Sequence, residues 1–308
     1  MGLNGIIVID KPAGVTSHDV VARVRRMTGE KSVGHLGTLD PMATGVLPLV
    51  LGRMTRLSQF YGEAEKCYEG EIRLGFATDT YDAEGEQVGV TTEVIVSLEQ
   101  LKQTAGTFRG ELQQVPPPFS AKKIQGVPAY KLARKDKPVE LKPVAVTVHE
   151  FEIERLDGDR ARFRARVSSG TYIRSIAHQL GQDLGCGAHL SALRRTRVAE
   201  FGPEEMVTFE QLEAAINDGA VEGLMVHPRK LLPEMPSVAA TDENAAWIRN
   251  GRAVNLPEMS SARLVKVFIG QREMIAIAQR IAGTLFHPKV VMMESQQPVS
   301  ASAGRGNG

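Results

Sequence analysis

The stretch Arg160 to Val167 alternates strictly between arginine and an apolar residue, and no other feature of the sequence constrains the fold more closely. Successive side chains of a β-strand point to opposite faces of a sheet, so this segment is predicted to be a strand with one apolar and one cationic face. Residues 144–153 read as a partner strand, joined to it through the favourable turn pair Asp157-Gly158. We therefore expect an antiparallel sheet with one face in the core. Its cationic face fits an ordinary solvated surface and an RNA-contacting surface equally well.

Three helices are predicted from the residues at their N-termini. Ser17 is placed to cap a helix that buries the valines following it. Ser97 with Gln100, and Thr208 with Gln211, have the spacing of a capping box, in which two side chains satisfy backbone N–H groups at the start of a helix. The chain therefore combines helices with antiparallel strands.

The length of 308 residues favours two domains. Several prolines between 228 and 236 mark a linker, and β-like runs such as 264–269 follow it. We place the first domain at 1–230 and a small second domain at 231–294. The last residues, 295–308, are rich in Ser, Gly, Gln and Asn, and we expect them to be disordered.

The composition is that of a soluble globular protein, with 42% hydrophobic and 24% charged residues and no apolar run long enough to cross a bilayer. The N-terminus leads directly into a predicted strand without the pattern of a secretory signal, so we expect a cytoplasmic protein without membrane contact. Cys67 and Cys186 stand in no metal-ligand spacing. Both are interpreted as free thiols, and no metal is expected.

Positive charge is concentrated in one segment, although the formal net charge is only +1. Residues 119–142 are predicted to form a basic loop, which suits contact with a polyanion. Its cationic residues are Lys122, Lys123, Lys131, Arg134, Lys135, Lys137 and Lys142, opposed by Asp136 and Glu140.

The segment 34–48 is the strongest candidate for a functional loop. Three glycines and two prolines in fifteen residues favour an open loop, and its leucines can anchor that loop in a core. Asp40 lies in the middle of it, and Pro41 biases this aspartate away from helical geometry. A carboxylate held toward a cleft and an ordinary Asp-Pro turn both fit this pattern.

Five motifs of the chain resemble, in order, those of the bacterial tRNA pseudouridine-55 synthase family, called TruB. Together they span most of residues 5–201, and their order makes a chance resemblance improbable, although each motif alone is a weak signal. Cys67 and Ala199 depart from the family's usual residues, the second standing where glycine is common. The motifs are IDKPAGVTS at 9–17, GHLGTLDPMATGVLP at 34–48, KCYEG with TDTYD at 66–82, VPPPFSAKK at 115–123, and SGTYIRS with GCGAHL at 169–190.

The resemblance implies a role for each of eight residues. Asp40 falls on the catalytic aspartate, taken as the nucleophile, Tyr68 on the tyrosine that stacks on the target base, and Arg174 on the arginine that pairs with the aspartate. Leu193 precedes an arginine-rich segment that would hold phosphates, and otherwise reads as a helix core residue. The remaining positions contact the flipped nucleotide or support the site: His35, Tyr172, Leu193, Lys11 and Asp82.

The implied reaction explains these residue types. Converting uridine to pseudouridine breaks the C1′–N1 bond, turns the uracil and joins C1′ to C5, without a cofactor. The sequence does not distinguish three ways in which the Asp40 carboxylate can assist the reaction: it can attack C1′, deprotonate the sugar or add to uracil C6. The base must be flipped out of its stack into a pocket with an aromatic wall, for which Tyr68 is suited.

The resemblance also implies a fold and partners. We expect an α+β protein with a mixed, largely antiparallel sheet flanked by helices, followed by a small β-rich, PUA-like RNA-binding domain. The expected substrate is the T stem-loop of tRNA, bound by a monomer without a protein partner. Two alternatives are a guide-RNA-dependent pseudouridine synthase and a non-catalytic RNA-binding or RNA-folding protein. The basic segment 119–142 argues against the first, and the presence of Asp40, Tyr68 and Arg174 argues against the second.

Overall fold

The computed structural model describes residues 2–117, 123–124, 127–128 and 142–293. The chain divides into two units, Met1–Val226 and His227–Gly308. Most of the basic segment 119–142, and all of the tail 295–308, lie outside the described residues. No helix in the described part combines the length and the apolar character needed to cross a membrane.

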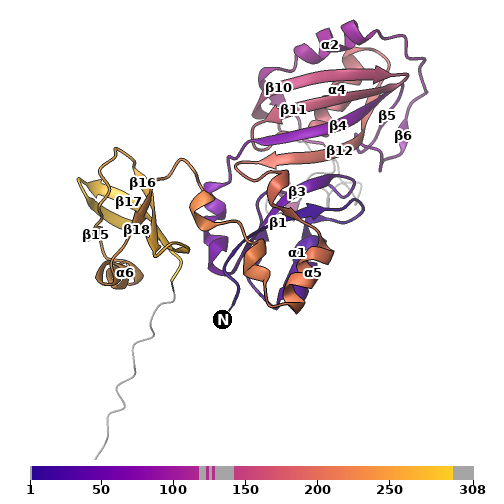
Figure 1. The fold of residues 1–308 in the computed structure, drawn as a ribbon. Coiled ribbons are helices and arrows are strands. Elements are labelled where there is room, and N and C mark those ends of the chain that lie inside the picture. Colours follow the sequence, from indigo (N-terminus) through magenta and orange to yellow (C-terminus); the bar gives the residue numbers. More distant parts are fainter. Residues whose placement is uncertain (1, 118–122, 125–126, 129–141, 294–308) are drawn as a thin grey trace, which may run out of the picture. The chain divides into compact units, whose positions relative to one another are not determined.

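One mixed sheet is the framework of the first unit (Figure 1). Two of its strand pairs are parallel and the others antiparallel, so the predicted largely antiparallel sheet is confirmed. In spatial order its strands are β13 (Met206–Val207), β1 (Gly5–Lys11), β3 (Thr44–Leu51), β12 (Ala188–Val198), β4 (Lys66–Leu74), β11 (Arg160–Val167), β10 (Val144–Asp157) and β7 (Gly110–Gln114), with β2 (Val33–His35) beside β3.

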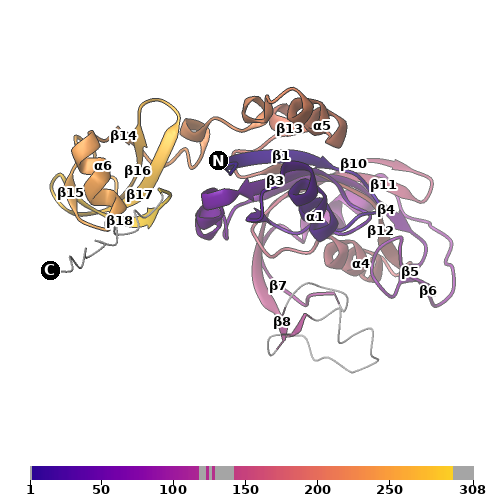
Figure 2. The same cartoon turned by 90° about the horizontal axis from the view of Figure 1, so that it is seen from below.

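Helices pack against this sheet and complete the α+β architecture (Figure 2). The core between them is continuous from α1 to α5. The helices are α1 (Ser17–Thr28), α2 (Leu98–Gly106), α4 (Ile173–Asp183) and α5 (Phe209–Asn217), with shorter turns η1 (Gly52–Phe60), η2 (Pro203–Glu205) and η3 (Val221–Leu224). Small two-stranded pairs are β5 (Ala77–Thr78) with β6 (Gln87–Val88), and β8 (Lys123–Ile124) with β9 (Val127–Pro128).

The alternating segment is a strand, β11, as the sequence predicts. Its apolar residues Ala161, Phe163, Ala165 and Val167 are all buried, at most 4% exposed. The turn after Asp157 contains Gly158 at φ 58°, a left-handed conformation that glycine adopts without strain. β10 continues four residues beyond the predicted end at 153, because it pairs with β11 up to that turn.

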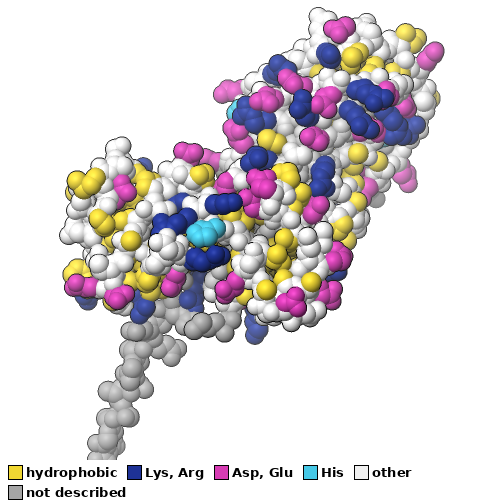
Figure 3. Space-filling model, in the orientation of Figure 1, with side chains coloured by type: hydrophobic (Ala, Val, Ile, Leu, Met, Phe, Trp, Pro, Cys, Tyr) yellow, Lys and Arg dark blue, Asp and Glu magenta, His cyan; other side chains and the backbone are white. Residues whose placement is uncertain are grey.

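The cationic face of β11 is largely neutralised by acidic neighbours. Arg160 pairs with Glu71, Arg164 with Glu154, and Arg166 with Glu150 and Glu65. Figure 3 shows basic and acidic side chains intermixed over this part of the molecule. Of the two readings of this face, the ordinary solvated surface therefore fits the structure better.

The capping predictions are confirmed at two helices and wrong at one. Ser97 with Gln100 and Thr208 with Gln211 form the expected capping boxes of α2 and α5. At α1 the cap is Thr16, which forms its box with Asp19. Ser17 is instead the first residue of the helix, and its buried hydroxyl bonds to the backbone of a distant loop.

The second unit is β-rich, as predicted. A five-stranded sheet is formed among its described residues, and α6 packs with it around a separate core. The elements are η4 (Pro228–Lys230), β14 (Ser237–Ala239), α6 (Asp242–Arg249), β15 (Val254–Asn255), β16 (Leu264–Ile269), β17 (Glu273–Ala282) and β18 (Leu285–Val291).

Candidate active site

Asp40 lies in the loop between β2 and β3, and three other parts of the chain hold that loop. The Ser17 hydroxyl accepts a hydrogen bond from Leu39 N at 2.8 Å. The Lys11 ammonium donates to Pro41 O at 3.1 Å and to Ala43 O at 2.6 Å. Lys11 is fully buried, and burial lowers its pKa to about 8. The loop around Asp40 is therefore fixed by backbone contacts on both sides of the carboxylate.

Arg195 on β12 provides the third anchor. Its guanidinium donates to Val46 O at 2.9 Å, Gly37 O at 3.0 Å and Thr38 O at 3.2 Å. The side chain is 0% exposed. The expectation that the arginine-rich segment holds phosphates is therefore wrong for this arginine, because its donors are already bonded to loop carbonyls. The neighbouring Arg194 lies partly exposed and contacts both oxygens of Asp10 at 3.0 Å.

Arg174, on the first turn of α4, joins two aspartates. Its Nε lies 2.9 Å from Asp40 Oδ2, and its Nη2 donates to Asp40 Oδ1 at 3.0 Å. Nη1 donates to Asp82 Oδ2 at 3.1 Å and to Thr80 O at 3.2 Å. Asp82 is itself fixed by the Thr80 hydroxyl, which donates to Oδ1 at 2.6 Å. The three charged side chains therefore form one rigid array, with Arg174 in the middle.

The electrostatics of this array set the charge of Asp40. Burial raises the pKa of the Asp40 carboxyl, and the Arg174 guanidinium opposes that rise. The nearby negative charge of Asp82 adds to it. The Asp40 side chain nevertheless keeps 32% of its surface exposed, so a ligand can reach it. Arg174 is therefore the group on which the ionised form of Asp40 most depends.

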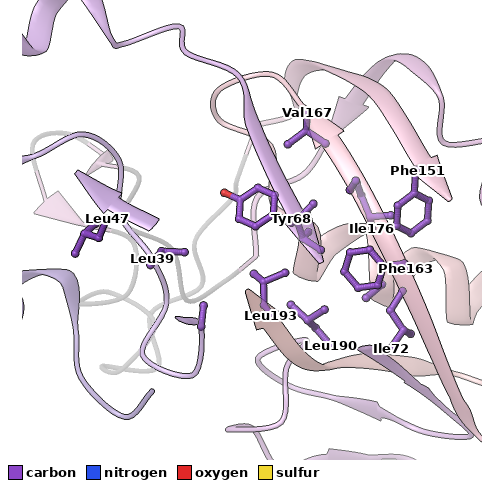
Figure 4. Packing of buried hydrophobic residues seen from close by; sticks show 14 of the residues in the cluster. Leu39, Leu47, Tyr68, Ile72, Phe151, Phe163, Val167, Ile176, Leu190 and Leu193 are labelled. Atoms are coloured by element: carbon purple, nitrogen blue, oxygen red, sulfur yellow. The ribbon is translucent and has the colours of Figure 1, made fainter. Parts of the chain in front are cut away.

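A pocket of about 270 Å³ opens beside Asp40. Tyr68 on β4 contributes an aromatic wall that is only 7% exposed, and Figure 4 shows its ring between Leu39 and Phe163. Burial raises the pKa of the Tyr68 hydroxyl, and the Arg195 guanidinium opposes this effect. The pocket is lined by Gly37, Thr38, Leu39, Asp40, Lys66, Tyr68, Ser169, Gly170, Thr171, Tyr172, Ile173, Arg174 and Leu193.

Five of the eight predicted site residues line this pocket. They are Asp40, Tyr68, Tyr172, Arg174 and Leu193. Leu193 lies on strand β12, which corrects its reading as a helix residue. Tyr172 caps α4, and its backbone forms two hydrogen bonds with the side chain of Gln114. Residues as far apart in the sequence as Asp40 and Leu193, which are separated by 153 positions, thus meet at one cavity.

The other three predicted residues lie outside the lining. Lys11 and Asp82 support the loop and Arg174, as described above. His35 is on β2, where its ring meets that of His18 edge-on at a centroid distance of 5.8 Å. Burial lowers the pKa of His35 to about 4, so the ring is neutral near pH 7.

Lys66 and Ser169 line the pocket but were not singled out from the sequence as site residues. Lys66 lies two residues before Tyr68 on the same strand, and side chains two apart share a face. The strand period therefore contains the signal that would have found it. Among the described residues, no group of three or more His, Cys, Asp or Glu side chains is arranged to hold a metal ion.

Two family models match the chain. One, described as TruB family pseudouridylate synthase (N terminal domain), matches residues 25–173. The other, described as tRNA pseudouridylate synthase B C-terminal domain, matches residues 174–232, which form the end of the first unit and the start of the second.

Curated relatives are similar over nearly their full length. The tRNA pseudouridine synthase B of Solibacter usitatus is 50% identical over 293 residues, covering 94% of this chain and 100% of the relative. The protein of the same name from Dehalococcoides mccartyi (strain CBDB1) is 39% identical over 297 residues, covering 96% and 99%.

Solved structures share the fold at lower identity. A Cbf5-Nop10-Gar1 complex contains a chain with a TM-score of 0.69 and 28% identity, covering 94% of this chain and 85% of that one. An H/ACA RNP bound to a substrate RNA containing 2′-deoxyuridine gives a TM-score of 0.70 and 26% identity, covering 95% and 86%.

Proposed function

This chain belongs to the TruB family of pseudouridylate synthases, and we propose that its target is the uridine at position 55, in the T stem-loop of tRNA. The chain isomerises uridine to pseudouridine in tRNA, the activity named for relatives up to 50% identical over nearly the whole length. The enzyme is an intramolecular transferase, and its reaction needs no group donor.

The observation that carries the assignment of catalytic residues is the Asp40–Arg174 pair at the pocket that Tyr68 also lines. A flipped uridine inside this pocket would have its base against the Tyr68 ring and its ribose within reach of the Asp40 carboxylate. Leu193 would close the apolar side of the base, and Tyr172 would contact the nucleotide from the start of α4.

The pocket chemistry follows from these positions. As the C1′–N1 bond breaks, its electron pair leaves with the uracil, and the ionised Asp40 acts at the ribose, as nucleophile in our proposal. The uracil turns within the pocket, and C5 attacks C1′ as the bond between C1′ and Asp40 breaks, which regenerates the carboxylate. The proton of C5 is then lost while N1 gains one. The ring of Tyr68 carries a hydroxyl group at this pocket, and we propose that it assists that proton transfer.

Outside the pocket, His35 is proposed to occupy the space that the flipped nucleotide leaves. Its ring is neutral near pH 7, and it ends strand β2, which leads directly into the loop that carries Asp40. Lys11 and Asp82 are proposed to act through the loop and through Arg174. The second unit is proposed to bind RNA as a PUA-like domain of residues 231–294. The supporting feature is its place as a separate β-rich unit after the unit that carries the pocket.

A stand-alone enzyme is favoured over a guide-dependent one. The two tRNA pseudouridine synthases B named above are 50% and 39% identical, whereas the chains from the Cbf5-Nop10-Gar1 complex and the H/ACA RNP are 28% and 26% identical. We therefore propose that the chain works as a monomer in the cytoplasm, without a guide RNA or an obligate protein partner. A non-catalytic RNA-binding role is disfavoured because Asp40, Tyr68 and Arg174 meet at one pocket.

The test uses the purified chain and an unmodified tRNA transcript, with no guide, cofactor or second protein. Pseudouridine is mapped along the transcript, and we expect it at position 55 alone. Asp40→Asn should abolish product while still binding RNA, and Asp183→Asn, on the exposed end of α4, is the matched control that should keep activity. Product at another position would refute the substrate assignment, and undiminished product in Asp40→Asn would refute the catalytic one.

A further inference from the structure

Lys66 is a cation in the pocket that the proposed mechanism does not use. It begins β4, two residues before Tyr68, and both side chains line the cavity beside Asp40. The Lys66 stem crosses the catalytic loop at Gly37, where a Cβ atom would lie 3.2 Å from Lys66 Cε. The glycine therefore leaves room for the lysine to reach the pocket, and a larger residue there would displace it.

The charges around the pocket single out Lys66. The positive charge of Arg174 is balanced by Asp40 and Asp82, and the donors of Arg195 are bonded to loop carbonyls. Within the described part of the chain, no carboxylate forms an ion pair with Lys66. Its positive charge is therefore available to an anion that enters the pocket.

The contacts of the ammonium leave one donor for such an anion. Lys66 Nζ donates to Ala64 O at 2.9 Å and to Ser169 Oγ at 3.4 Å. An ammonium has three N–H groups, so one remains after these contacts to described residues. The Ser169 hydroxyl also lines the pocket and supplies a second donor beside it. Burial lowers the pKa of Lys66 to about 8, as expected for an ammonium with no carboxylate partner.

The anion with the right chemistry is a phosphate of the RNA backbone. A flipped nucleotide stays joined to the strand through two phosphates, which must lie at the rim of any pocket that encloses the base and ribose. Lys66 and Ser169 are both half-buried, which places them at such a rim. Neutral uracil, in contrast, offers no charge before the C1′–N1 bond breaks.

We propose that Lys66, with the Ser169 hydroxyl beside it, binds a phosphate that flanks the target nucleotide. Lys66 is then a substrate-binding residue that fixes the ribose relative to Asp40. This inference rests on the proposed function, because it takes an RNA nucleotide as the occupant of the pocket.

The experiment measures binding of a T stem-loop RNA to full-length chains that carry Asp40→Asn to prevent turnover. Lys66→Met should bind roughly ten-fold more weakly than the parent, the loss of one charge-assisted hydrogen bond. The slope of log affinity against log salt should become shallower by about 0.7 to 0.9, the loss of one phosphate contact. Lys66→Arg should restore most of both. Lys102→Met, an exposed lysine on α2, is the matched control and should leave both unchanged.

Neutral methylphosphonate linkages identify the phosphate. A methylphosphonate placed on the 5′ or the 3′ side of the target uridine should weaken binding to the Lys66 parent at one of the two positions. The same linkage should have little effect in Lys66→Met, because the contact is already lost.

Two results would overturn the proposal. One is unchanged affinity and salt slope for Lys66→Met, together with a lower kcat when the same substitution is made in the active chain that retains Asp40. That result would place the ammonium at the base in the transition state. The other is a methylphosphonate penalty of the same size with and without Lys66. Failure of the unmutated chain to form pseudouridine in the T stem-loop would instead refute the proposed function itself, so the two failures are distinguishable.

Discussion

Arg174 contacts both oxygens of Asp40, with Nε 2.9 Å from Oδ2 and Nη2 3.0 Å from Oδ1. This two-point contact fixes the rotation of the carboxylate as well as its position. The third nitrogen of the guanidinium is held by Asp82, which is only 2% exposed. Because Arg174 lowers the pKa of Asp40 and Asp82 raises it, substitution of these two residues should shift that pKa in opposite directions.

Replacing Arg174 by methionine should shift the acidic limb of the pH–rate profile to higher pH. The guanidinium lowers the pKa of Asp40 against the effect of burial, so without it the carboxyl gains its proton at a higher pH. Since the carboxylate is the proposed active form, activity should be lost earlier as the pH falls. We also expect kcat to fall at least about a hundred-fold at neutral pH, from the loss of orientation. An acidic limb that does not move would mean that Arg174 does not control the ionisation of Asp40.

Asp82→Asn should shift the same limb in the other direction. The negative charge of Asp82 raises the pKa of Asp40, and an amide removes that charge while keeping an oxygen for Arg174 Nη1. The acidic limb should therefore move to lower pH, with kcat reduced by about ten-fold because Arg174 is held less firmly. The check is the profile of kcat between pH 4 and 8, measured beside that of Arg174→Met. Shifts of the same sign in both variants would contradict the arrangement.

Parts of the fold were predictable from side-chain patterns within single elements, and the main site residues were predictable from the order of the motifs. The capping boxes of α2 and α5 and the alternating strand β11 follow from side-chain chemistry within a few residues. The meeting of Asp40, Tyr68 and Arg174 followed from the order of the motifs, not from any local pattern.

What the sequence did not predict depends on contacts between distant segments. Arg194 and Arg195 are adjacent and identical in type, yet one is partly exposed and the other fully buried under the catalytic loop. Only the pairing of β12 beside β3, more than a hundred residues earlier, decides this. Ala199 is a further case, because its φ of 48° explains why glycine is common there but not how this chain accommodates alanine.

Arg195→Met should destabilise the first unit and loosen the catalytic loop. The substitution leaves Gly37 O, Thr38 O and Val46 O without their guanidinium donor, at a cost of roughly 2–4 kcal/mol in the free energy of unfolding. Urea titration followed by far-UV circular dichroism measures this loss. Arg162→Met is the control. Arg162 is exposed on β11, which is separated from β12 by β4, and its substitution should change the free energy of unfolding by less than about 0.5 kcal/mol. Equal stability in the two variants would mean that the carbonyls find other donors.

Gly45→Ala should be among the most damaging single-methyl substitutions in the chain. Gly45 pairs with Arg195 in the parallel contact of β3 with β12 and has a φ of 101°, and a Cβ there would lie 2.2 Å from the backbone oxygen of Arg195. Because that oxygen belongs to the strand that also anchors the catalytic loop, relief of the clash requires β3 and β12 to separate. Gly158→Ala is the matched control, since Gly158 also has a positive φ, of 58°, but has nothing within 4 Å of its Cβ position. Left-handed strain alone should cost the control about 1 kcal/mol, whereas Gly45→Ala should lose clearly more stability and also lower kcat. Similar losses of stability in the two variants would show that the strands separate without penalty.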